Sequence, residues 1–212
     1  MNLLIVGGTG QVGRATTDAA LAAGHTVTAF GRSAAKLDAR PGLTPHAGDV
    51  LEPEDVHRAV AGHDAVVATF GAPLNLDTIT HVPDVTTRGT EHILTAMREH
   101  GVDRLVCMTM IGAGDSRGHG RAVFSNFFRP VILGRITADR ERQEERVRAS
   151  GTQWTIVRPT ELKEGSLTGD YRVYEDLDGV TAAQITRADV GDYLVRAVGD
   201  KATVGRTYLI TE

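Results

Sequence analysis

The chain has 212 residues, of which 41% are hydrophobic and 24% charged, and its formal net charge is −4. These values are ordinary for a globular protein, and this length predicts a single domain over residues 1–212. The small negative charge gives no electrostatic reason to expect binding to nucleic acid or to an anionic membrane. The single cysteine, Cys107, cannot form an internal disulfide, and its apolar neighbours predict a core residue rather than a nucleophile.

No apolar run approaches the ~20 residues needed to cross a bilayer. Residues 1–6 lack a basic segment and lead directly into glycines, which predicts a strand and not a signal peptide. We therefore expect a cytoplasmic location, and we identify no metal site.

Short apolar runs alternate with amphipathic stretches along the chain. The runs predict strands at residues 2–6, 26–30, 43–47, 65–69, 104–108, 153–157 and 207–210. The stretches predict helices at residues 11–23, 53–61, 86–100, 138–150 and 187–198. Strands that alternate with helices of this length indicate parallel βαβ units. The expected fold class is α/β, a Rossmann-type doubly wound parallel sheet with helices on both faces.

Residues 112–133 are the least regular part of the chain. They hold four glycines, followed by an aromatic cluster of Phe124, Phe127 and Phe128. We interpret this segment as a substrate-side loop over a pocket. The alternative is a surface excursion that packs on its own aromatic side chains.

Three glycines, Gly7, Gly10 and Gly13, form the pattern G-x-x-G-x-x-G between the first predicted strand and the first predicted helix. This is the context in which such a pattern binds the pyrophosphate of a dinucleotide. We expect Gly7 and Gly10 to allow a tight turn with positive φ, and Gly13 to let the helix pack closely on the strand. The N–H groups that begin the helix would then face the phosphates.

The end of the second predicted strand indicates which dinucleotide is bound. An NAD site usually carries a carboxylate there to bind the ribose 2′-hydroxyl, whereas this chain has Arg32, followed by Lys36. Two cations can clamp a 2′-phosphate, so we predict a preference for NADP(H). Asp49, after the third predicted strand, could accept a hydrogen bond from the adenine amino group, with Val50 against the ring.

The chain lacks the tyrosine with a lysine four residues later that ordinary short-chain dehydrogenases use to protonate a carbonyl oxygen. None of its four tyrosines is followed by lysine at that spacing. A positioned acid typically accelerates such a reaction about 10²–10⁴-fold, so its absence favours acceptors that spread the incoming charge themselves. Flavins, quinones and other conjugated systems are of this kind.

Two side chains are candidates for a catalytic role. Thr109, just after the fifth predicted strand, could touch the nicotinamide or a substrate, or could be a structural hydrogen bonder. Glu161, just after the sixth, could relay a proton or repel an anionic substrate, or could simply face water.

Taken together, these residues resemble the atypical short-chain dehydrogenases, specifically the group of biliverdin-IXβ reductase (flavin reductase) and its NmrA-like bacterial relatives. The resemblance covers nearly the whole chain. It is carried by residues 7–13, Arg32 with Lys36, and residues 48–50, 61–67, 101–106, 149–151, 154–159 and 167–171.

The resemblance implies cofactor contacts that extend beyond the glycine pattern. They fall on Thr9, Gly10, Gln11, Val12, Arg32, Lys36, Asp49, Val50, Phe70, Gly71, Thr109 and Pro159. The chain departs from the flavin reductase in the substrate cleft. It has Met110 where that enzyme has a serine, and Glu161 where that enzyme has a histidine, and both changes argue against biliverdin or flavin as the substrate.

Two functions from different classes agree with the sequence. The first is an NADPH-dependent reductase that transfers hydride to a small conjugated acceptor, such as a flavin, a quinone or a tetrapyrrole-like molecule, without a Tyr–Lys pair. Its partner would be a small-molecule substrate of aromatic character. The alternative is a non-catalytic redox sensor that binds NADP(H) and reports its state to a partner protein.

Overall fold

The computed structural model describes residues 1–38, 40–71, 84–116, 129–178, 180 and 183–212. Eight strands form one sheet in the order β3-β2-β1-β4-β5-β6-β10-β8. Their bounds are β1 Asn2–Val6, β2 Thr26–Phe30, β3 Leu43–His46, β4 Ala65–Ala68, β5 Arg104–Met108, β6 Gln153–Pro159, β8 Arg172–Tyr174 and β10 Arg206–Thr211. The pairs are parallel from β3 to β10, and β8 runs antiparallel to β10. The expected α/β class with a mostly parallel Rossmann-type sheet is confirmed.

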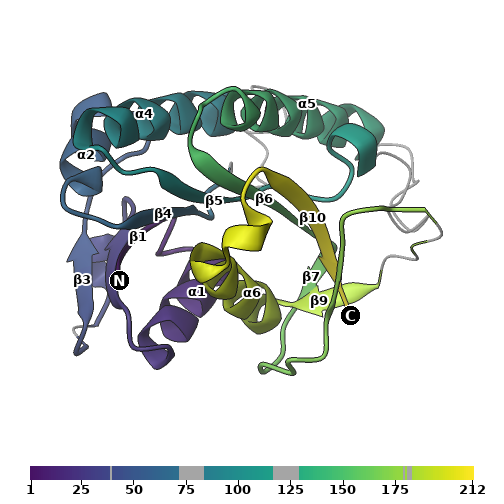
Figure 1. Cartoon of the computed structure of the whole chain (residues 1–212), viewed down its shortest axis with the longest axis horizontal. Helices are drawn as coiled ribbons and strands as arrows, with labels where there is room; N and C mark the ends of the chain where they lie inside the picture. The colour runs from purple at the N-terminus through teal and green to yellow at the C-terminus, as the bar shows by residue number, and fades with distance from the viewer. Residues whose placement is uncertain (39, 72–83, 117–128, 179, 181–182) are drawn as a thin grey trace.

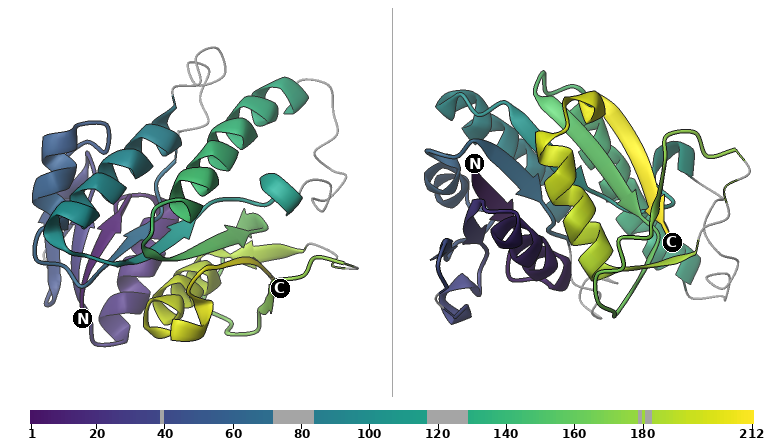
Figure 2. Two further views of the ribbon diagram at one scale, coloured as in Figure 1. Left: turned by 45° about the horizontal axis from the view of Figure 1, so that its top comes forward. Right: turned by 60° about the horizontal axis from the view of Figure 1, so that its bottom comes forward.

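Helices cover both faces of this sheet (Figure 1). Their bounds are α1 Gln11–Ala22, α2 Pro53–Val60, α4 Val85–His100, α5 Arg129–Arg148 and α6 Arg187–Gly199. Helices α2, α4 and α5 lie along one face, whereas α1 and α6 lie side by side on the other, as Figure 2 also shows. Strand β1 pairs with β2 on one side and with β4 on the other, so the strand order reverses at this point.

Each face of the sheet has its own apolar core, because successive residues of a strand point to opposite faces. On the side of α1 and α6, Leu3 and Ile5 pack in a cluster with residues of those helices. On the other side, Leu4 and Val6 pack in a cluster with residues of α2 and α4. All of these strand residues are buried, which is the pattern of a parallel sheet covered on both faces.

Helices α1 and α6 pack closely because α6 carries a glycine at the contact. A Cβ atom on Gly191 would lie 2.7 Å from the backbone nitrogen of Thr16. Any side chain there would push the two helices apart. This contact positions α1, whose first turn belongs to the glycine pattern.

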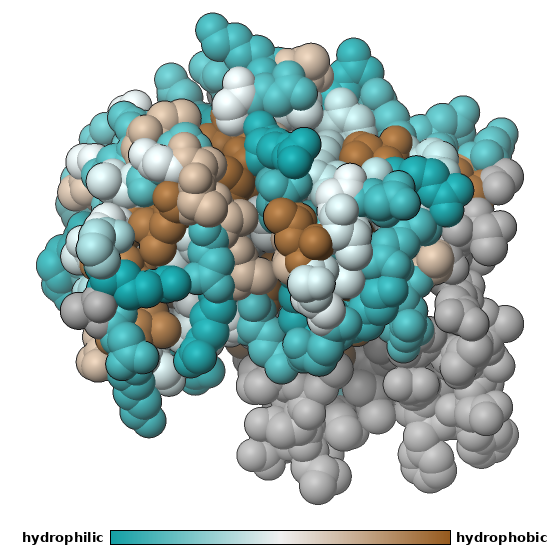
Figure 3. Space-filling model, turned by 90° about the horizontal axis from the view of Figure 1, so that it is seen from below, coloured by the Kyte–Doolittle hydropathy of each residue, from teal (hydrophilic) through white to brown (hydrophobic). Residues whose placement is uncertain are grey.

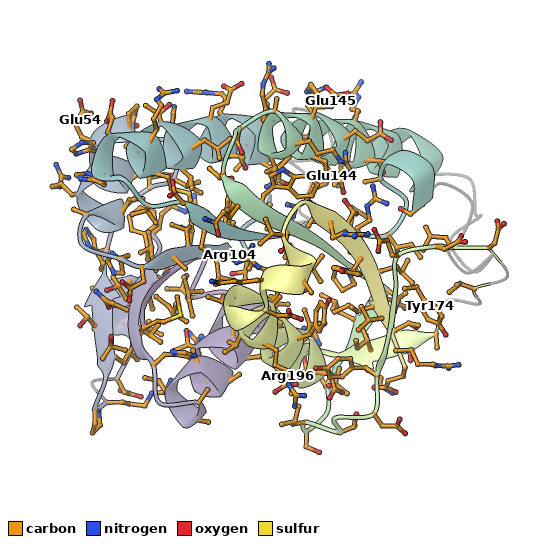
Figure 4. All side chains as sticks on the ribbon, viewed as in Figure 1. Glu54, Arg104, Glu144, Glu145, Tyr174 and Arg196 are labelled. Atoms are coloured by element: carbon orange, nitrogen blue, oxygen red, sulfur yellow. The ribbon has the colours of Figure 1, made fainter. Side chains whose placement is uncertain are left out.

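Arg104 joins three elements at the edge of the sheet where β5 and β6 begin. Its buried guanidinium donates to the carbonyl of Val198 at 3.0 Å, near the end of α6, and also to the carbonyl of Ala197. It donates as well to the hydroxyls of Thr155 in β6 (2.8 Å) and Thr203 (3.0 Å). The cation thereby satisfies helix-end carbonyls that have no partner within the helix. Figure 4 shows Arg104 on the α6 side of the sheet.

Asp189, in the first turn of α6, ties the preceding loop to that helix. Its buried carboxylate accepts from the backbone N–H groups of Thr168 (2.9 Å) and Gly169 (2.8 Å) and from the hydroxyls of Thr168 and Thr186. Burial alone would raise the pKa of Asp189. The hydrogen bonds outweigh burial and hold its pKa below the ordinary value.

Besides shifts of one or two residues at the ends of several elements, the structure differs from the sequence prediction in three main respects. Strand β6 continues to Pro159, two residues beyond the predicted end. Helix α5 begins at Arg129, inside the segment predicted as a loop, since Pro130 suits the first turn of a helix. The short strands β7 (Glu161–Lys163), β8 and β9 (Gln184–Thr186) were not predicted, because three residues are too few to show a period.

On the surface seen in Figure 3, hydrophobic side chains form several separate patches divided by hydrophilic ones. Among the residues that the structure describes, the exposed large hydrophobic side chains are Met1, Leu167 and Val173. Within the same residues, no helix combines the length and the apolar character that crossing a membrane requires.

Candidate functional site

The chain turns sharply where β1 ends, and glycine makes this turn. Gly7 has a φ of +85°, a conformation that other residues rarely adopt. The N–H groups of Gly7 and Gly8 donate to the carbonyl of Phe30 at 2.9 and 3.1 Å, which fixes the turn to the end of β2. The N–H of Gly10 donates back to the carbonyl of Gly7 at 2.9 Å and closes the turn.

Gly7 and Gly13 leave no room for a side chain. A Cβ atom on Gly7 would lie 2.8 Å from the backbone nitrogen of Phe70, and one on Gly13 would lie 2.1 Å from the carbonyl oxygen of Gly7. The predicted reason for Gly13 is therefore corrected: it lets α1 approach the turn itself rather than the strand. At both glycines a side chain would collide with neighbouring backbone, so the turn of residues 7–13, here called the glycine cradle, can pack closely only with glycine at these positions.

Gly10 also differs from its expected conformation. Its φ is −74°, so the prediction of a positive φ at Gly10 is wrong. Gly10 is the N-cap of α1, and its carbonyl accepts the first helical bond, from the N–H of Arg14 at 2.9 Å. The following N–H groups, of Gln11, Val12 and Gly13, begin the helix and have no partner within it, which is the usual basis of an anion site.

Strand β2 ends beside this turn. A Cβ atom on Gly31 would lie 3.0 Å from the hydroxyl oxygen of Thr9 in the turn. The next residue, Arg32, is exposed, as is Lys36 at the end of a short 3₁₀ helix, η1 (Ala34–Lys36). In the described parts of the chain, neither cation has a carboxylate partner. Two positive charges without a carboxylate partner among the described residues therefore lie just past β2, at the same end of the sheet as the glycine turn.

The segment after β3 is held rigidly. Asp49 accepts from the N–H of Leu51 at 3.0 Å, and its own N–H donates to the carboxylate of Asp55 at 2.9 Å. The carbonyl of Val50 is 3.0 Å from Nδ1 of His92 on α4. Since the turn uses one oxygen of Asp49, its other oxygen is the acceptor that a base could use.

Strand β4 ends at a buried cation. Arg140 of α5 donates to the carbonyl of Phe70 at 3.2 Å, and a Cβ atom on Gly71 would lie 2.5 Å from its Nη2. The same guanidinium donates to Oε1 of Gln143 at 2.8 Å. Burial lowers the pKa of Arg140, but a guanidinium keeps its charge in proteins. A fixed positive charge therefore lies at the carboxyl ends of β4 and β5.

A buried ion pair joins α5 to β6. Glu144 is 0% exposed and Arg158 is 1% exposed. The guanidinium donates through Nε and Nη2 to the two carboxylate oxygens, at 2.9 and 2.7 Å. Figure 4 shows Glu144 on the sheet side of α5 and its neighbour Glu145 on the outer side. This two-point geometry is the strong form of an arginine–carboxylate pair.

Thr109, the first residue after β5, belongs to this network. Its hydroxyl donates to Oε1 of Glu144 at 2.7 Å, and the side chain is buried. A hydroxyl has one proton, so Thr109 can offer only its lone pairs to any further partner. In this arrangement Thr109 can accept a hydrogen bond but cannot itself donate a proton.

The segment after Met110 covers the ion pair. The N–H of Ile111 donates to the carbonyl of Pro159 at 3.2 Å. A Cβ atom on Gly114, at the start of the 3₁₀ helix η2 (Gly114–Ser116), would lie 2.8 Å from Nη2 of Arg158. Glu161 is partly buried. It is the first residue of β7, the strand that follows β6 in the chain. The predicted cluster of Phe124, Phe127 and Phe128 lies outside the described residues.

Helix α5 also fixes α4 in place. The buried carboxylate of Asp139 accepts from the N–H groups of Thr86 (3.0 Å) and Thr87 (3.1 Å), and from both of their hydroxyls. The sites near the ends of β4 and β5 are thus built on two helices, of which α5 supplies the carboxylate that caps the first turn of α4.

Sequence reasoning placed the glycine turn, Arg32 and the strand ends along one edge of the sheet, and the structure brings them together there. It did not identify Arg140, Glu144 or Arg158 as a buried set. Two signals were present: Arg158 interrupts an apolar strand, and Arg140 and Glu144 are four residues apart, hence on one face of a helix. A charge in a buried strand needs a partner.

Cys107 and the tyrosines are not part of this edge. Cys107 is fully buried, and burial raises its pKa to about 12, so the prediction of an inert core residue is confirmed. The hydroxyl of Tyr171 donates to Asp192 of α6 at 2.7 Å, and its ring packs edge-on against Tyr193. Burial is the main reason that the pKa of Tyr171 is raised.

Comparison with known proteins adds to this geometry. A family model described as NAD(P)H-binding matches residues 7–201. An uncharacterised chloroplastic protein of Arabidopsis thaliana is 30% identical over 92% of this chain and 71% of its own length. A 2-alkyl-3-oxoalkanoate reductase of Stenotrophomonas maltophilia is 38% identical over 50% of this chain. That match spans only 32% of the enzyme's length.

Solved structures show the same fold. ChuY, an anaerobilin reductase of Escherichia coli O157:H7, has a TM-score of 0.82 at 21% identity, over 100% of this chain and 97% of its own. A short-chain dehydrogenase/reductase of Veillonella parvula, solved in complex with NADP, has a TM-score of 0.78 at 18% identity. That match covers 100% of this chain and 94% of the other. At such identities the likeness concerns the fold alone.

Proposed function

From the premise that this chain belongs to the NAD(P)H-binding family, within the atypical short-chain dehydrogenases, we propose that it is an NADPH-dependent reductase of a small conjugated acceptor. The family has oxidoreductase members, including the reductase relatives described above. The proposal extends to a preference for NADPH, to the class of acceptor and to the roles of the site residues.

The observation that carries the proposal is the glycine cradle. At Gly7 and Gly13 the positions of a Cβ atom are already occupied by backbone, which holds the turn tight and places the first N–H groups of α1 beside it. This surface fits a pyrophosphate, which needs close backbone approach and a positive potential. Thr9, Gly10, Gln11 and Val12 would be in contact with the phosphates.

The preference for NADPH rests on Arg32 and Lys36. Both are exposed beside the cradle without a carboxylate partner among the described residues, so both are available to a 2′-phosphate. Charge-assisted hydrogen bonds of this kind contribute about 1.5–3 kcal/mol each. Asp49 and Val50 would bind the adenine, whereas Phe70, Gly71, Thr109 and Pro159 would border the nicotinamide half.

The acceptor class follows from the groups that the site offers. Helix α5 presents Arg140 and Glu144 toward the sheet and contains no tyrosine, and the hydroxyl of Thr109 is committed to Glu144. Bound NADPH would supply the hydride, while the fixed charge of Arg140 would favour negative charge that develops nearby. A conjugated acceptor that takes its proton from water, or by way of Glu161, suits such a site best.

The preference for NADPH is tested with Arg32→Glu. This variant should bind NADPH about ten- to a hundredfold more weakly and should bind NADH as the parent protein does. Isothermal titration calorimetry with both nucleotides measures the difference. Lys201→Glu, the same charge reversal at an exposed position on the opposite edge of the sheet, should change neither affinity. An equal loss of both nucleotides in Arg32→Glu would refute the assignment.

The reductase activity is tested by following NADPH absorbance with a panel of flavins and quinones. Turnover of at least one acceptor is expected, and Arg32→Glu should raise the KM for NADPH. Tight binding of NADPH with no turnover of any acceptor would count against a reductase.

A second candidate is a non-catalytic redox sensor that binds NADP(H). The observation in its favour is that Thr109 cannot donate its proton while it is bonded to Glu144. A sensor should bind a partner protein differently when it holds NADP⁺ than when it holds NADPH. It should not reduce any small acceptor. Rapid hydride transfer to any acceptor in the panel would decide against it.

A further inference from the structure

Arg140 of α5 carries a buried positive charge that is not paired with a carboxylate. The residue is 8% exposed, and its guanidinium donates to neutral acceptors, namely the carbonyls of Phe70 (3.2 Å) and Met108 (3.4 Å) and Oε1 of Gln143 (2.8 Å). Among the residues that the structure describes, no aspartate or glutamate forms an ion pair with it. Burying a charge is unfavourable unless a counter-charge is supplied.

Two buried carboxylates of α5 lie near Arg140, but both are already committed. Glu144 pairs with Arg158 at 2.7 Å and with Arg148 at 2.9 Å. Asp139 accepts hydrogen bonds from N–H groups and hydroxyls of the first turn of α4. They attract Arg140 from a distance without meeting its guanidinium, so its charge is not answered at close range.

Arg104 shows how the protein treats a comparable cation elsewhere. It is also 8% exposed and donates to the carbonyls of Val198 and Ala197 near the end of α6, where the helix dipole is negative. Arg140 instead faces the ends of strands, and a sheet has little net dipole. A bound molecule is therefore the remaining source of a counter-charge for Arg140.

The guanidinium of Arg140 reaches the edge of the sheet where the dinucleotide is proposed to bind. A Cβ atom on Gly71 would lie 2.5 Å from its Nη2, so a side chain there would displace the cation from the end of β4. Its Nε has no acceptor among the described residues, yet it is not fully enclosed. In that part of the chain, the enclosed side-chain atoms without a partner are Oγ1 of Thr160 and Oε1 of Glu212. The cation is therefore open to a ligand.

Two anions could supply the counter-charge. The pyrophosphate would lie at the turn after β1, where the first N–H groups of α1 answer its charge. Arg140 lies beyond that turn, at the ends of β4 and β5, beside the nicotinamide half. An acceptor must contact the nicotinamide ring to receive the hydride, so it lies here as well. Hydride transfer leaves a positive charge on the ring, which an anionic acceptor would offset.

We propose that the acceptor carries an anionic group, a carboxylate, sulfonate or phosphate, that binds to Arg140 at the end of β4. The inference rests on the proposed function and narrows the acceptor to anionic conjugated molecules. A guanidinium with an open N–H group suits the oxygens of such an anion. Glu161, the carboxylate that follows β6, would repel the same group, so the anionic end of the acceptor points toward β4.

The test compares two probes that differ chiefly in charge. Naphthalene-2-sulfonate is anionic, whereas naphthalene-2-sulfonamide has nearly the same shape and is neutral. Calorimetry with the NADP⁺-saturated protein should show the sulfonate binding about tenfold more tightly than the sulfonamide. In Arg140→Gln this preference should fall below about twofold, whereas Arg140→Lys keeps the charge and should retain most of it.

A matched control makes the same change on the other side of α5. Arg146 lies on the outer face, where it pairs with Glu91 at 2.7 Å, and Arg146→Gln should leave both affinities unchanged. Arg140→Gln should also bind NADP⁺ within about twofold of the parent protein, because the pyrophosphate is bound by the turn after β1. If Arg140→Gln does not fold, the comparison of the two probes in the parent protein and in Arg140→Lys remains decisive.

Equal affinity of the parent protein for the two probes, or no binding of either, would overturn the inference and leave the proposed function intact. The same holds if Arg140→Gln keeps the preference for the sulfonate but binds NADP⁺ more weakly, which would assign the counter-charge to the dinucleotide. If the parent protein bound no NADP⁺, the proposed function would fall with it.

Discussion

The two halves of the candidate site are built in opposite ways. Around the turn between β1 and α1, backbone packs directly against backbone, and the glycines at positions 7 and 13 make this packing possible. At the ends of β5 and β6, the surface rests on side chains, with Glu144 and Arg158 joined below it and Thr109 bonded to the pair.

This difference teaches how each half can fail. The turn has no free space at Gly7 and Gly13, so a side-chain atom added at either position would disrupt its packing. The network depends on matched buried charges, so it is destabilised when Glu144 or Arg158 is removed and the remaining charge loses that partner. Substitutions chosen on this basis separate the two kinds of construction.

The largest effect is expected from the network. Glu144→Ala removes the buried carboxylate that pairs with Arg158 and Arg148, and it should lower the free energy of unfolding by about 3–5 kcal/mol. Urea denaturation measures it. Glu145→Ala, at the next residue on the outer side of α5, should stay within about 0.5 kcal/mol of the parent protein. Equal effects at the two positions would mean that the ion pair contributes little.

The turn should give a smaller loss of stability but a complete loss of binding. In Gly13→Ala the new Cβ atom would collide with the carbonyl of Gly7, which should lower stability by about 1–3 kcal/mol. Titration with NADPH should show no binding. Gly134→Ala, at an exposed helical glycine with open space around it, should be neutral or gain up to about 1 kcal/mol. Normal NADPH affinity in Gly13→Ala would show that the cradle tolerates a side chain.

Asp189 lies outside both halves, and its effect on stability, comparable to that of the turn, calibrates them. Its folded pKa is below the ordinary value, so its stabilising contribution is full above the unfolded pKa and is lost as pH falls through the folded pKa. Asp189→Asn should lower stability by about 1.5–3 kcal/mol near pH 7. The difference from the parent protein should shrink below about pH 4. Urea titrations over this range measure it, with the exposed Asp170→Asn as control, and a difference independent of pH would contradict the assignment.

The sequence allowed the backbone half of the site to be predicted because its determinants are local. Gly7 and Gly13 are six residues apart, and the positions of Arg32 and Asp49 follow from the strands that precede them. Even there, the conformation predicted for Gly10 was wrong, because the pattern does not distinguish a glycine with positive φ from one that begins a helix.

The side-chain half was not predicted because its contacts join distant segments. Thr109, Glu144 and Arg158 come from β5, α5 and β6, and only the packed sheet brings them together. Helix α5 was also predicted too short, because its first turns fall in a stretch whose glycines and aromatic residues resemble a loop.

The guanidinium of Arg104 has a consequence for how the chain is made. Its acceptors include Thr203, 99 positions further along, so its hydrogen bonds to Thr203 and to the end of α6 can form only after residues 197–203 have left the ribosome. Contacts between such distant positions are slow to form, because a long loop must close first. We therefore expect the start of β5 to be among the last parts to become ordered during synthesis, long after β1 and the glycine turn have been translated.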